Sequence, residues 1–326
     1  MNPPVISLVV PCYNEEQMLP RTAARLAEEL AVLGKEGLVS SSSRVVFVDD
    51  GSQDATWEII SRLAGADGCF SGVRLTRNFG HQYALYAGLM LAPGDALISL
   101  DADLQDDVGA LRDMILAFSA GHEIVFGVRS DRSSDSPFKR LTARLHYRLA
   151  AGFGIETVQE HADFRLMSRR AIGLLARYRE SNLYLRGIVP LLGLRSCTVA
   201  FRREARQAGV SKYGLRRMIG LSLRGLTSFS IMPLRLIAAM GFMVFMVSML
   251  LGAWAFGAVL FSDRAVPGWA STVIPIYLLG GMQLLALGVV GEYIGKTYME
   301  VKHRPLFLVQ QTCELPSGGE HLDRDL

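Results

Sequence analysis

Short apolar runs alternate with segments of helical periodicity along the first part of the chain. In the segment that extends to about residue 33, Leu19, Ala23, Leu26 and Leu30 recur at the spacing of one helix face. The apolar runs expected to form strands cover residues 5–10, 44–48, 73–75, 96–100 and 123–128, and further helices are expected over 55–63, 82–91 and 108–120. Such alternation predicts an α/β domain with a mostly parallel sheet and helices on both faces.

Local signals suggest where two of these elements begin and end. Pro11 lacks a backbone N–H and is predicted to stop the first strand. Asn14 is one candidate for the N-cap of the helix that follows, and Asp54 or Ser52 is expected to cap the helix over 55–63.

Acidic residues follow two of the predicted strands. The turn at 49–52 reads Asp-Asp-Gly-Ser, and Asp101 and Asp103 follow the run at 96–100. Ligands bind at the carboxyl edge of open α/β sheets, so these groups mark a candidate site. Asp101 and Asp103 can reach one hard cation, Mg²⁺ or Mn²⁺, with the Gln105 amide oxygen as a third ligand and substrate phosphates completing the shell. A solvated loop is the alternative for an isolated Asp-x-Asp.

The turn after the first strand carries groups that suit a nucleoside. Tyr13 can stack on a base, and Glu15 can accept a hydrogen bond from a ribose hydroxyl or a base N–H. Neither a Gly-x-Gly-x-x-Gly after the first strand nor a Walker loop occurs, which argues against a dinucleotide or P-loop fold. His81 at a predicted helix start is a catalytic candidate, although a structural role is the commoner one for a lone histidine.

Beyond the α/β region the composition changes. Residues 195–235 are rich in Arg and Lys, with Glu204 as the single acidic residue, and 215–235 reads as a basic amphipathic interfacial helix. Residues 236–261 and 265–291 are uncharged, long enough to span a hydrocarbon core of ~30 Å at ~1.5 Å per residue. Positive charges flank the pair, which predicts a hairpin with both ends cytoplasmic. A buried core helix is the alternative.

The remaining composition narrows the setting. Four scattered cysteines indicate reduced thiols, and the start of the chain shows no signal-peptide pattern, so the first domain is expected in the cytoplasm. Glycines in the uncharged stretches permit helix contacts and a homo-oligomer. The basic segments lack interleaved aromatics and a recognition motif, which argues against nucleic acid as a partner. The polar residues 311–326 are predicted to be disordered.

Several ordered motifs now resemble a known family. The chain has Pro-Cys-Tyr-Asn-Glu at 11–15, Asp-Asp-Gly-Ser at 49–52, Asp-Ala-Asp-Leu-Gln at 101–105 and Gly-Val-Arg at 127–129. Over residues 5–310 these resemble the family 2 glycosyltransferases of the GT-A fold. More narrowly they resemble polyprenyl-phosphate glycosyltransferases, which include bactoprenol (undecaprenyl-phosphate) glucosyltransferases and dolichol-phosphate mannose synthases.

The resemblance implies roles for particular residues. The residues expected to hold the nucleotide sugar are Pro11, Tyr13, Glu15, Val48, Asp50, Asp101, Ala102 and Asp103. Asp101, Asp103 and Gln105 would hold the metal, and Asp103 would also be catalytic. Arg206 and Lys212, in an Arg-x-x-Gly-x-Ser-Lys-Tyr element, are expected near the diphosphate. Val210 stands where many relatives have Glu, which weakens inferences about closure of this loop.

On the acceptor side, the resemblance assigns the lipid phosphate to Arg129 and Arg140. The rigid guanidinium fork suits a phosphate monoester. Asp163 is the carboxylate nominated as catalytic base. A phosphate monoester has a second pKa near ~6 and is mostly ionised at neutral pH, so Asp163 is alternatively an orienting residue.

These expectations combine into one domain plan and one activity. The plan is a GT-A domain over 1–212, amphipathic helices over 213–235, transmembrane helices over 236–261 and 270–294, and a cytoplasmic tail over 295–326. The activity is inverting transfer of a hexose, best matched by glucose from UDP-glucose, to polyprenyl phosphate at the bacterial inner membrane, for envelope glycan and lipopolysaccharide O-antigen modification. A GDP-mannose enzyme and a non-catalytic nucleotide-sugar sensor are the alternatives. A processive synthase is disfavoured because no Gln-x-x-Arg-Trp element occurs.

Overall fold

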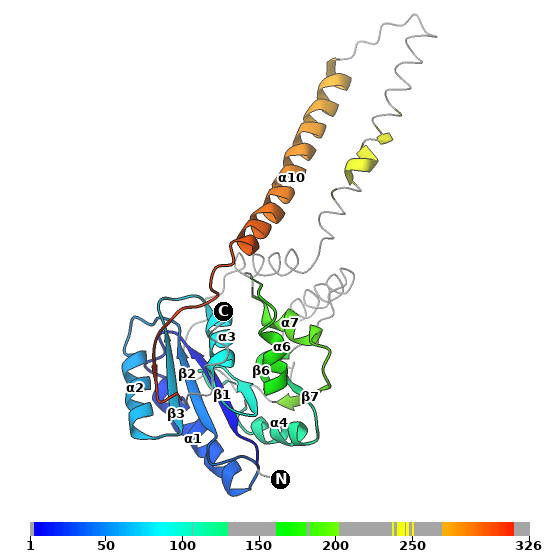
Figure 1. Cartoon of the computed structure of the whole chain (residues 1–326). Coiled ribbons are helices and arrows are strands. Elements are labelled where there is room, and N and C mark those ends of the chain that lie inside the picture. Colours follow the sequence, from blue (N-terminus) through cyan, green and yellow to red (C-terminus); the bar gives the residue numbers. More distant parts are fainter. Residues whose placement is uncertain are drawn as a thin grey trace, which may run out of the picture. The chain divides into compact units, whose positions relative to one another are not determined.

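The structure is a computed structural model of the chain (Figure 1). It describes residues 3–105, 107–129, 161–180, 183–201 and 269–315, together with 237, 240–244, 246, 247 and 250. The chain divides into two units. The first contains the sheet and its helices, and the second contains the long helix α10.

The first unit alternates strands and helices, as the hydrophobic pattern predicts. Its strands are β1 (Ile6–Cys12), β2 (Arg44–Asp49), β3 (Phe70–Leu75), β4 (Ala96–Ser99), β5 (Ile124–Arg129), β6 (His161–Ser168), β7 (Ser196–Phe201) and β8 (Val309–Cys313). Its helices are α1 (Leu19–Lys35), α2 (Thr56–Ala66), α3 (His81–Leu91), α4 (Ala110–Ser119), α6 (Arg169–Leu175) and α7 (Leu185–Leu191).

The eight strands in the described part of the chain form one mixed sheet in the order β7-β5-β6-β4-β1-β2-β3-β8. The neighbours β4, β1, β2 and β3 run parallel, and β5 and β7 also pair in parallel. Strand β6 is antiparallel to both β4 and β5, and β8 is antiparallel to β3. The predicted mostly parallel α/β sheet is therefore confirmed, with β6 and β8 as antiparallel additions.

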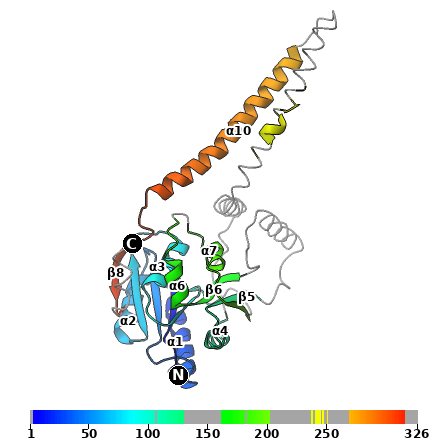
Figure 2. The ribbon, with the colours of Figure 1, turned by 45° about the vertical axis from the view of Figure 1, so that its right-hand side comes forward.

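Helices cover both faces of the central strands (Figures 1 and 2). Leu8 and Val10 of β1 belong to the same buried cluster as apolar residues of α1, α2 and α4. Val9 faces the opposite way, because a Cβ added at Gly88 of α3 would collide with its side chain. Since side chains alternate across a strand, both faces of β1 are covered, and every residue of this strand is buried.

Two local predictions at the first strand are wrong. β1 continues through Pro11 to Cys12. The ladder with β4 ends at Val9, two residues before Pro11, and the Val9 carbonyl accepts from Leu100 on the β4 side. The backbone groups of residues i and i+2 point to the same side of a strand, so the nitrogen of Pro11 points to the β4 side, as Val9 does. The pairing with β4 has already ended there, and no ladder hydrogen bond is lost because Pro11 has no N–H. Asn14 is likewise no N-cap, because α1 begins only at Leu19.

The predicted disorder from residue 311 onward is also wrong for its first residues. β8 includes Gln311 and Thr312 and pairs with β3, with Val73 opposite Thr312. An edge strand exposes unpaired backbone groups, and β8 satisfies those of β3 although its own side chains are polar. The Thr76 N–H also donates to the Leu308 carbonyl. Residues near the end of the chain therefore complete the sheet.

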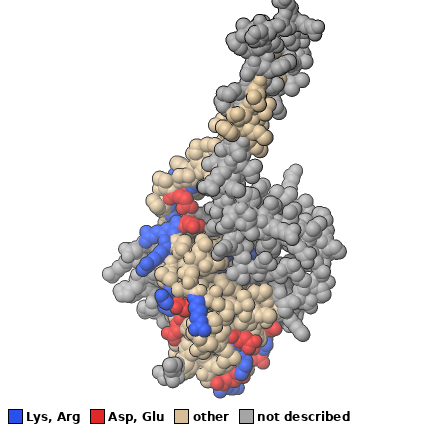
Figure 3. Space-filling view, turned by 90° about the vertical axis from the view of Figure 1, so that its right-hand side faces the viewer, with Lys and Arg blue, Asp and Glu red and all other residues tan. Residues whose placement is uncertain are grey.

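The second unit contains α10, which runs from Trp269 to Val301 over 33 residues. It covers the stretch predicted as the second transmembrane helix. The charged residues of α10 are confined to its last third (Glu292, Lys296 and Glu300), and the atoms of this helix that are not grey in Figure 3 are tan over most of its length. No helix within the described residues meets the length and apolarity required to cross a membrane. The segments 213–235 and 251–261 lie outside the described residues.

Candidate active site

The carboxyl ends of β1, β2 and β4 bring the predicted nucleotide residues to one edge of the sheet. Pro11 of β1 lies directly opposite Val48 of β2 in the parallel ladder. Beyond them, the Asn14 N–H donates to Ser52 Oγ at 3.0 Å, and Asn14 Oδ1 accepts from the Gln53 N–H at 2.9 Å. Asn14 adopts a left-handed φ of 54°, which asparagine tolerates well. The side chain proposed as a cap therefore joins the two turns instead.

Further contacts fix the same pair of turns. The Glu15 N–H donates to Thr56 Oγ1 at 2.9 Å, and the Glu16 N–H donates to Asp54 Oδ2 at 3.2 Å. Asp54 also accepts from the Thr56 N–H at 3.1 Å, but the N-cap residue of α2 is Ala55, so the prediction of Asp54 or Ser52 as the cap is wrong. Tyr13 remains exposed beside them. The turns are thus rigid, while the aromatic ring expected to stack on a base is accessible.

Asp50 connects this edge to the start of α3. Its carboxylate accepts from the backbone N–H groups of Phe79 at 2.7 Å and Gly80 at 2.9 Å. Burial raises the pKa of Asp50, and the two backbone donors oppose that rise. Both oxygens therefore hold the turn that ends at His81, the first residue of α3. The residue predicted to bind the nucleotide also positions this histidine.

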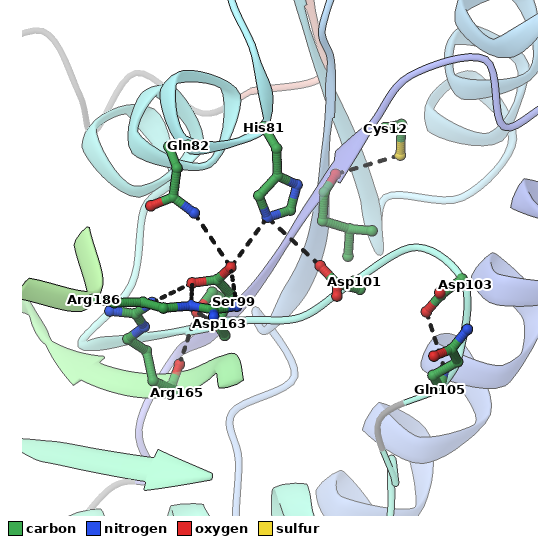
Figure 4. Close-up of polar contacts among 11 residues, drawn as sticks. Cys12, His81, Gln82, Ser99, Asp101, Asp103, Gln105, Asp163, Arg165 and Arg186 are labelled. Atoms are coloured by element: carbon green, nitrogen blue, oxygen red, sulfur yellow. Dashed lines mark hydrogen bonds and ion pairs between the residues drawn. The ribbon is translucent and has the colours of Figure 1, made fainter. Parts of the chain in front are cut away.

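The Asp-x-Asp segment follows β4 as predicted. The Ala102 carbonyl accepts from Thr22 Oγ1 of α1 at 2.7 Å, and the Gln105 N–H donates to Asp103 Oδ1 at 3.2 Å. Figure 4 shows Asp103 beside Gln105, whereas Asp101 points toward His81. The two carboxylates leave the segment in different directions, with the Ala102 backbone tied to α1 between them.

Asp163 on β6 is the centre of the densest polar cluster in Figure 4. Its Oδ1 lies 2.6 Å from Arg165 Nη2 and 3.1 Å from Arg186 Nε. Its Oδ2 lies 3.0 Å from Arg186 Nη2 and 3.3 Å from Gln82 Nε2. Gln82 in turn accepts from the Leu185 N–H at 3.2 Å, so α3 and the start of α7 are joined at this carboxylate.

These contacts favour the ionised form of Asp163. Burial opposes ionisation, but the interaction with His81 and the charges of Arg165 and Arg186 lower the pKa of the carboxyl far below its usual range. A carboxylate with such a low pKa is a weak proton acceptor. The geometry therefore suits an orienting anion better than a general base.

His81 lies between two carboxylates. Its Nε2 is 3.7 Å from Asp101 Oδ1 and 3.6 Å from Asp163 Oδ2. Burial works against protonation, but the interaction with Asp163 and the charge of Asp101 raise the pKa of His81. His81 thus links the Asp-x-Asp segment to β6, and the sequence reasoning that left its role open understated how central it is.

The donor set predicted for a divalent cation has suitable chemistry, but in the structure Asp101 faces His81 and Asp103 faces Gln105, so the two carboxylates do not converge on one point. Within the described residues, no group of three or more His, Cys, Asp or Glu side chains is arranged to hold a metal. The predicted ligands are two carboxylates and one amide, and Mg²⁺ typically takes only one or two carboxylates from the protein. Burial raises the pKa of Asp101, against the effect of His81, and the charges of Asp163 and Asp103 add to the rise. A cation would relieve this crowding of negative charge.

Four predicted residues lie outside the described set, either entirely or in their side chains. Arg129 is the last residue of β5, at the sheet edge expected for a substrate contact, but its side chain lies outside the described set. Arg140, Arg206 and Lys212 also fall outside the described residues.

The sequence reasoning missed Arg165, Arg186 and Gln82. Residues 161–168 were not predicted as a strand; once β6 is known, Asp163 and Arg165, two residues apart on it, are expected to share a face. Gln82 and Arg186 carry no comparable local signal. They meet Asp163 only because α3 and α7 converge on β6.

A mixed, mostly parallel α/β sheet with an Asp-x-Asp at a strand end defines the GT-A class of sugar-transferring enzymes. Comparison with known families agrees: residues 7–176 match the model described as Glycosyl transferase family 2. The chain belongs to this family and is a glycosyltransferase, as the motifs predicted.

Similarity to individual relatives extends over almost the whole chain. The uncharacterized glycosyltransferase YkoT of Bacillus subtilis is 45% identical, over 94% of this chain and 91% of that protein. The SfII prophage-derived bactoprenol glucosyl transferase of Shigella flexneri is 40% identical, over 94% and 98%. The prophage bactoprenol glucosyl transferase homolog of Escherichia coli is 39% identical, over the same shares.

Proposed function

We propose that this glycosyltransferase moves a glucosyl residue from UDP-glucose to a polyprenyl phosphate of the bactoprenol type. The observation that carries the proposal is the junction at His81, which brings the Asp-x-Asp carboxylate Asp101 beside the arginine-bound Asp163. A site that contains both acidic and basic groups suits a nucleotide-sugar donor and an anionic acceptor. Supporting this, the bactoprenol glucosyl transferases match over 94% of the chain.

The proposed reaction is a single displacement. A phosphate oxygen of the acceptor forms a bond to the anomeric carbon, and the bond from that carbon to the diphosphate oxygen breaks, with the electron pair leaving on UDP. The product is a polyprenyl-phosphate sugar with inverted anomeric configuration. Because a phosphate monoester with a second pKa near ~6 is mostly ionised at neutral pH, the attacking oxygen needs no strong base. This agrees with the weak basicity of Asp163.

Asp101, Asp103 and Gln105 would hold Mg²⁺ or Mn²⁺. When bound, such a cation neutralises the charge that develops on a diphosphate leaving group. Asp163 holds Arg186 in place, and Asp50 fixes the turn that presents His81. Tyr13 and Glu15 are proposed to contact the nucleoside.

We further propose that the chain is held in the bacterial inner membrane by a helical hairpin over 236–261 and 270–294, with the sheet unit and both termini cytoplasmic. Supporting this, both stretches are uncharged up to Glu292, and exposed apolar side chains are spaced along α10, including Ile276, Leu287 and Ile294. A lipid acceptor that cannot leave the bilayer would then meet a donor from the aqueous phase.

A donor panel tests this proposal. Full-length protein in detergent is incubated with undecaprenyl phosphate, Mg²⁺ and UDP-glucose, UDP-galactose, UDP-N-acetylglucosamine or GDP-mannose, and release of nucleoside diphosphate is measured with and without the lipid. We expect lipid-dependent release of UDP from UDP-glucose. Lipid-dependent release from GDP-mannose alone would instead identify a mannosyltransferase. Donor binding without turnover of any donor would favour the sensor.

A further inference from the structure

Two arginines bind the Asp163 carboxylate. Arg165, with a side chain only 1% exposed, and Arg186 both bind this one carboxylate, at 2.6 and 3.0 Å. A guanidinium stays protonated in proteins, so two cations share a single anion. Burying an unpaired charge is costly. Of the two arginines, Arg186 is the one that remains accessible to solvent.

Arg186 is the more accessible of the two arginines. Its side chain is 42% exposed, whereas the Asp163 side chain that holds it is 10% exposed. Both oxygens of Asp163 accept hydrogen bonds from one edge of the Arg186 guanidinium: Oδ1 from Nε at 3.1 Å and Oδ2 from Nη2 at 3.0 Å. This two-point contact fixes the orientation of the fork. Among the described residues, Asp163 is the only hydrogen-bond partner of Arg186, so the Nη1 side is available to a ligand.

Arg186 is connected through Asp163 and His81 to Asp101, the Asp-x-Asp carboxylate proposed to bind the sugar donor. His81 approaches both Asp101 and Asp163 within 3.7 Å, so one imidazole spans the distance between the Asp-x-Asp carboxylate and the carboxylate that holds Arg186 (Figure 4). His81 and Asp101 are half-exposed, as Arg186 is. Three accessible side chains thus surround a nearly buried Asp163.

We propose that Arg186 is a substrate-phosphate contact, with its Nη1 edge donating to a phosphate oxygen while Asp163 holds the opposite edge. This inference rests on the proposed function and adds a residue that the motif resemblance did not nominate. The donor diphosphate and the acceptor phosphate offer the same chemistry. Asp163 then acts as a positioning residue that aims Arg186.

Binding measurements on full-length protein in detergent test the proposal. Wild type, Arg186→Gln and Arg186→Lys are titrated with two phosphate-bearing probes, UDP with Mg²⁺ and farnesyl phosphate. Each probe is paired with its phosphate-free counterpart, uridine or farnesol. Arg170→Gln is the matched control, because Arg170 pairs with Glu123 on an exposed surface at 2.6 Å.

We expect Arg186→Gln to weaken one phosphate-bearing probe at least tenfold, equivalent to ~1.4 kcal/mol, while its phosphate-free counterpart binds as to wild type. Loss for UDP but not uridine assigns Arg186 to the donor, and loss for farnesyl phosphate but not farnesol assigns it to the acceptor. Arg186→Lys, which keeps the charge but not the fork, should fall between wild type and Arg186→Gln.

Unchanged binding of both phosphate probes, or equal weakening of a probe and its phosphate-free counterpart, would overturn the proposal and leave Arg186 a structural partner of Asp163. If Arg186→Gln does not fold, the same comparison is made with Arg186→Lys. The probes need no turnover, so absence of sugar transfer in the wild type would refute the proposed function without deciding the role of Arg186.

Discussion

Arg165 Nη2 lies 2.6 Å from Asp163 Oδ1, and this pair, two residues apart on β6, is almost completely buried. The Arg165 Nη1 group also donates to the Leu185 carbonyl at 3.2 Å, which ties β6 to the first residue of α7. The pair therefore links the strand that carries the central carboxylate to the helix that carries Arg186.

Arg165→Met should destabilise the protein by about 3 kcal/mol, because Asp163 would lose its most buried countercharge. The measurement is thermal unfolding in detergent, with Arg170→Met as control for loss of an exposed arginine. Exposed ion pairs contribute little, so the control should melt close to wild type. Equal melting temperatures for the two variants would contradict a structural role for the buried pair.

Gly51→Ala should destabilise the fold by about 2 kcal/mol and weaken UDP binding. Gly51 has a φ of 66°, and a Cβ there would lie 2.5 Å from the Arg77 carbonyl carbon, in the segment that leads to His81. Gly65→Ala is the control, since a Cβ at Gly65 meets nothing within 4 Å and alanine favours the helix. Normal UDP binding by Gly51→Ala would show that this turn does not position the site.

The stability contributed by His81 should depend on pH. Its pKa is raised in the folded state, so its contribution is fully present below the ordinary value of 6.5 and is lost as the pH rises through the folded pKa. The difference in melting temperature between wild type and His81→Gln, measured with a chelator present, should be larger at acidic than at alkaline pH. Arg170→Gln should show no such dependence. If the difference in melting temperature between wild type and His81→Gln stayed constant across pH, His81 would not form stabilising ion pairs with Asp101 and Asp163.

Leu287→Arg should impair membrane retention. Leu287 on α10 is 67% exposed, and an arginine at the centre of a spanning helix costs about 2.5–3.5 kcal/mol. The measurement is the fraction of expressed protein recovered in sedimented membranes after an alkaline wash. Leu116→Arg, at an exposed position of α4, is the control and should be retained. Equal retention of both variants would argue against a span at α10.

The hydrophobic pattern predicted β1 to β5 because these strands are short, apolar and separated by clear helices, but it did not predict β6, β7 or β8. Strand β8 was missed because its residues are polar and its partner, β3, is more than two hundred positions earlier in the sequence. The carboxylates of the site could be predicted, since Asp101 directly follows an apolar run and Asp50 comes two residues after one. Gln82 and Arg186 could not, because only tertiary packing brings α3 and α7 to the same carboxylate.

Asp103→Asn should reduce sugar transfer about 10²–10³-fold, the usual cost of removing one group that stabilises developing charge. Asp113→Asn on the exposed side of α4 is the matched control and should retain wild-type activity. The comparison is made at saturating donor concentration, so that weaker binding is not mistaken for slower chemistry. Full activity of Asp103→Asn would show that the Asp103 carboxylate is not needed for sugar transfer.

The most direct test of the account is mass spectrometry of the lipid product. Full-length protein is incubated with undecaprenyl phosphate, UDP-glucose and Mg²⁺, and the extracted lipid is analysed alongside the released UDP. The account predicts undecaprenyl phosphate heavier by one hexosyl residue, in an amount equal to the UDP released and absent after chelation. UDP release with no glycosylated lipid, or no lipid product from any nucleotide sugar, would contradict it.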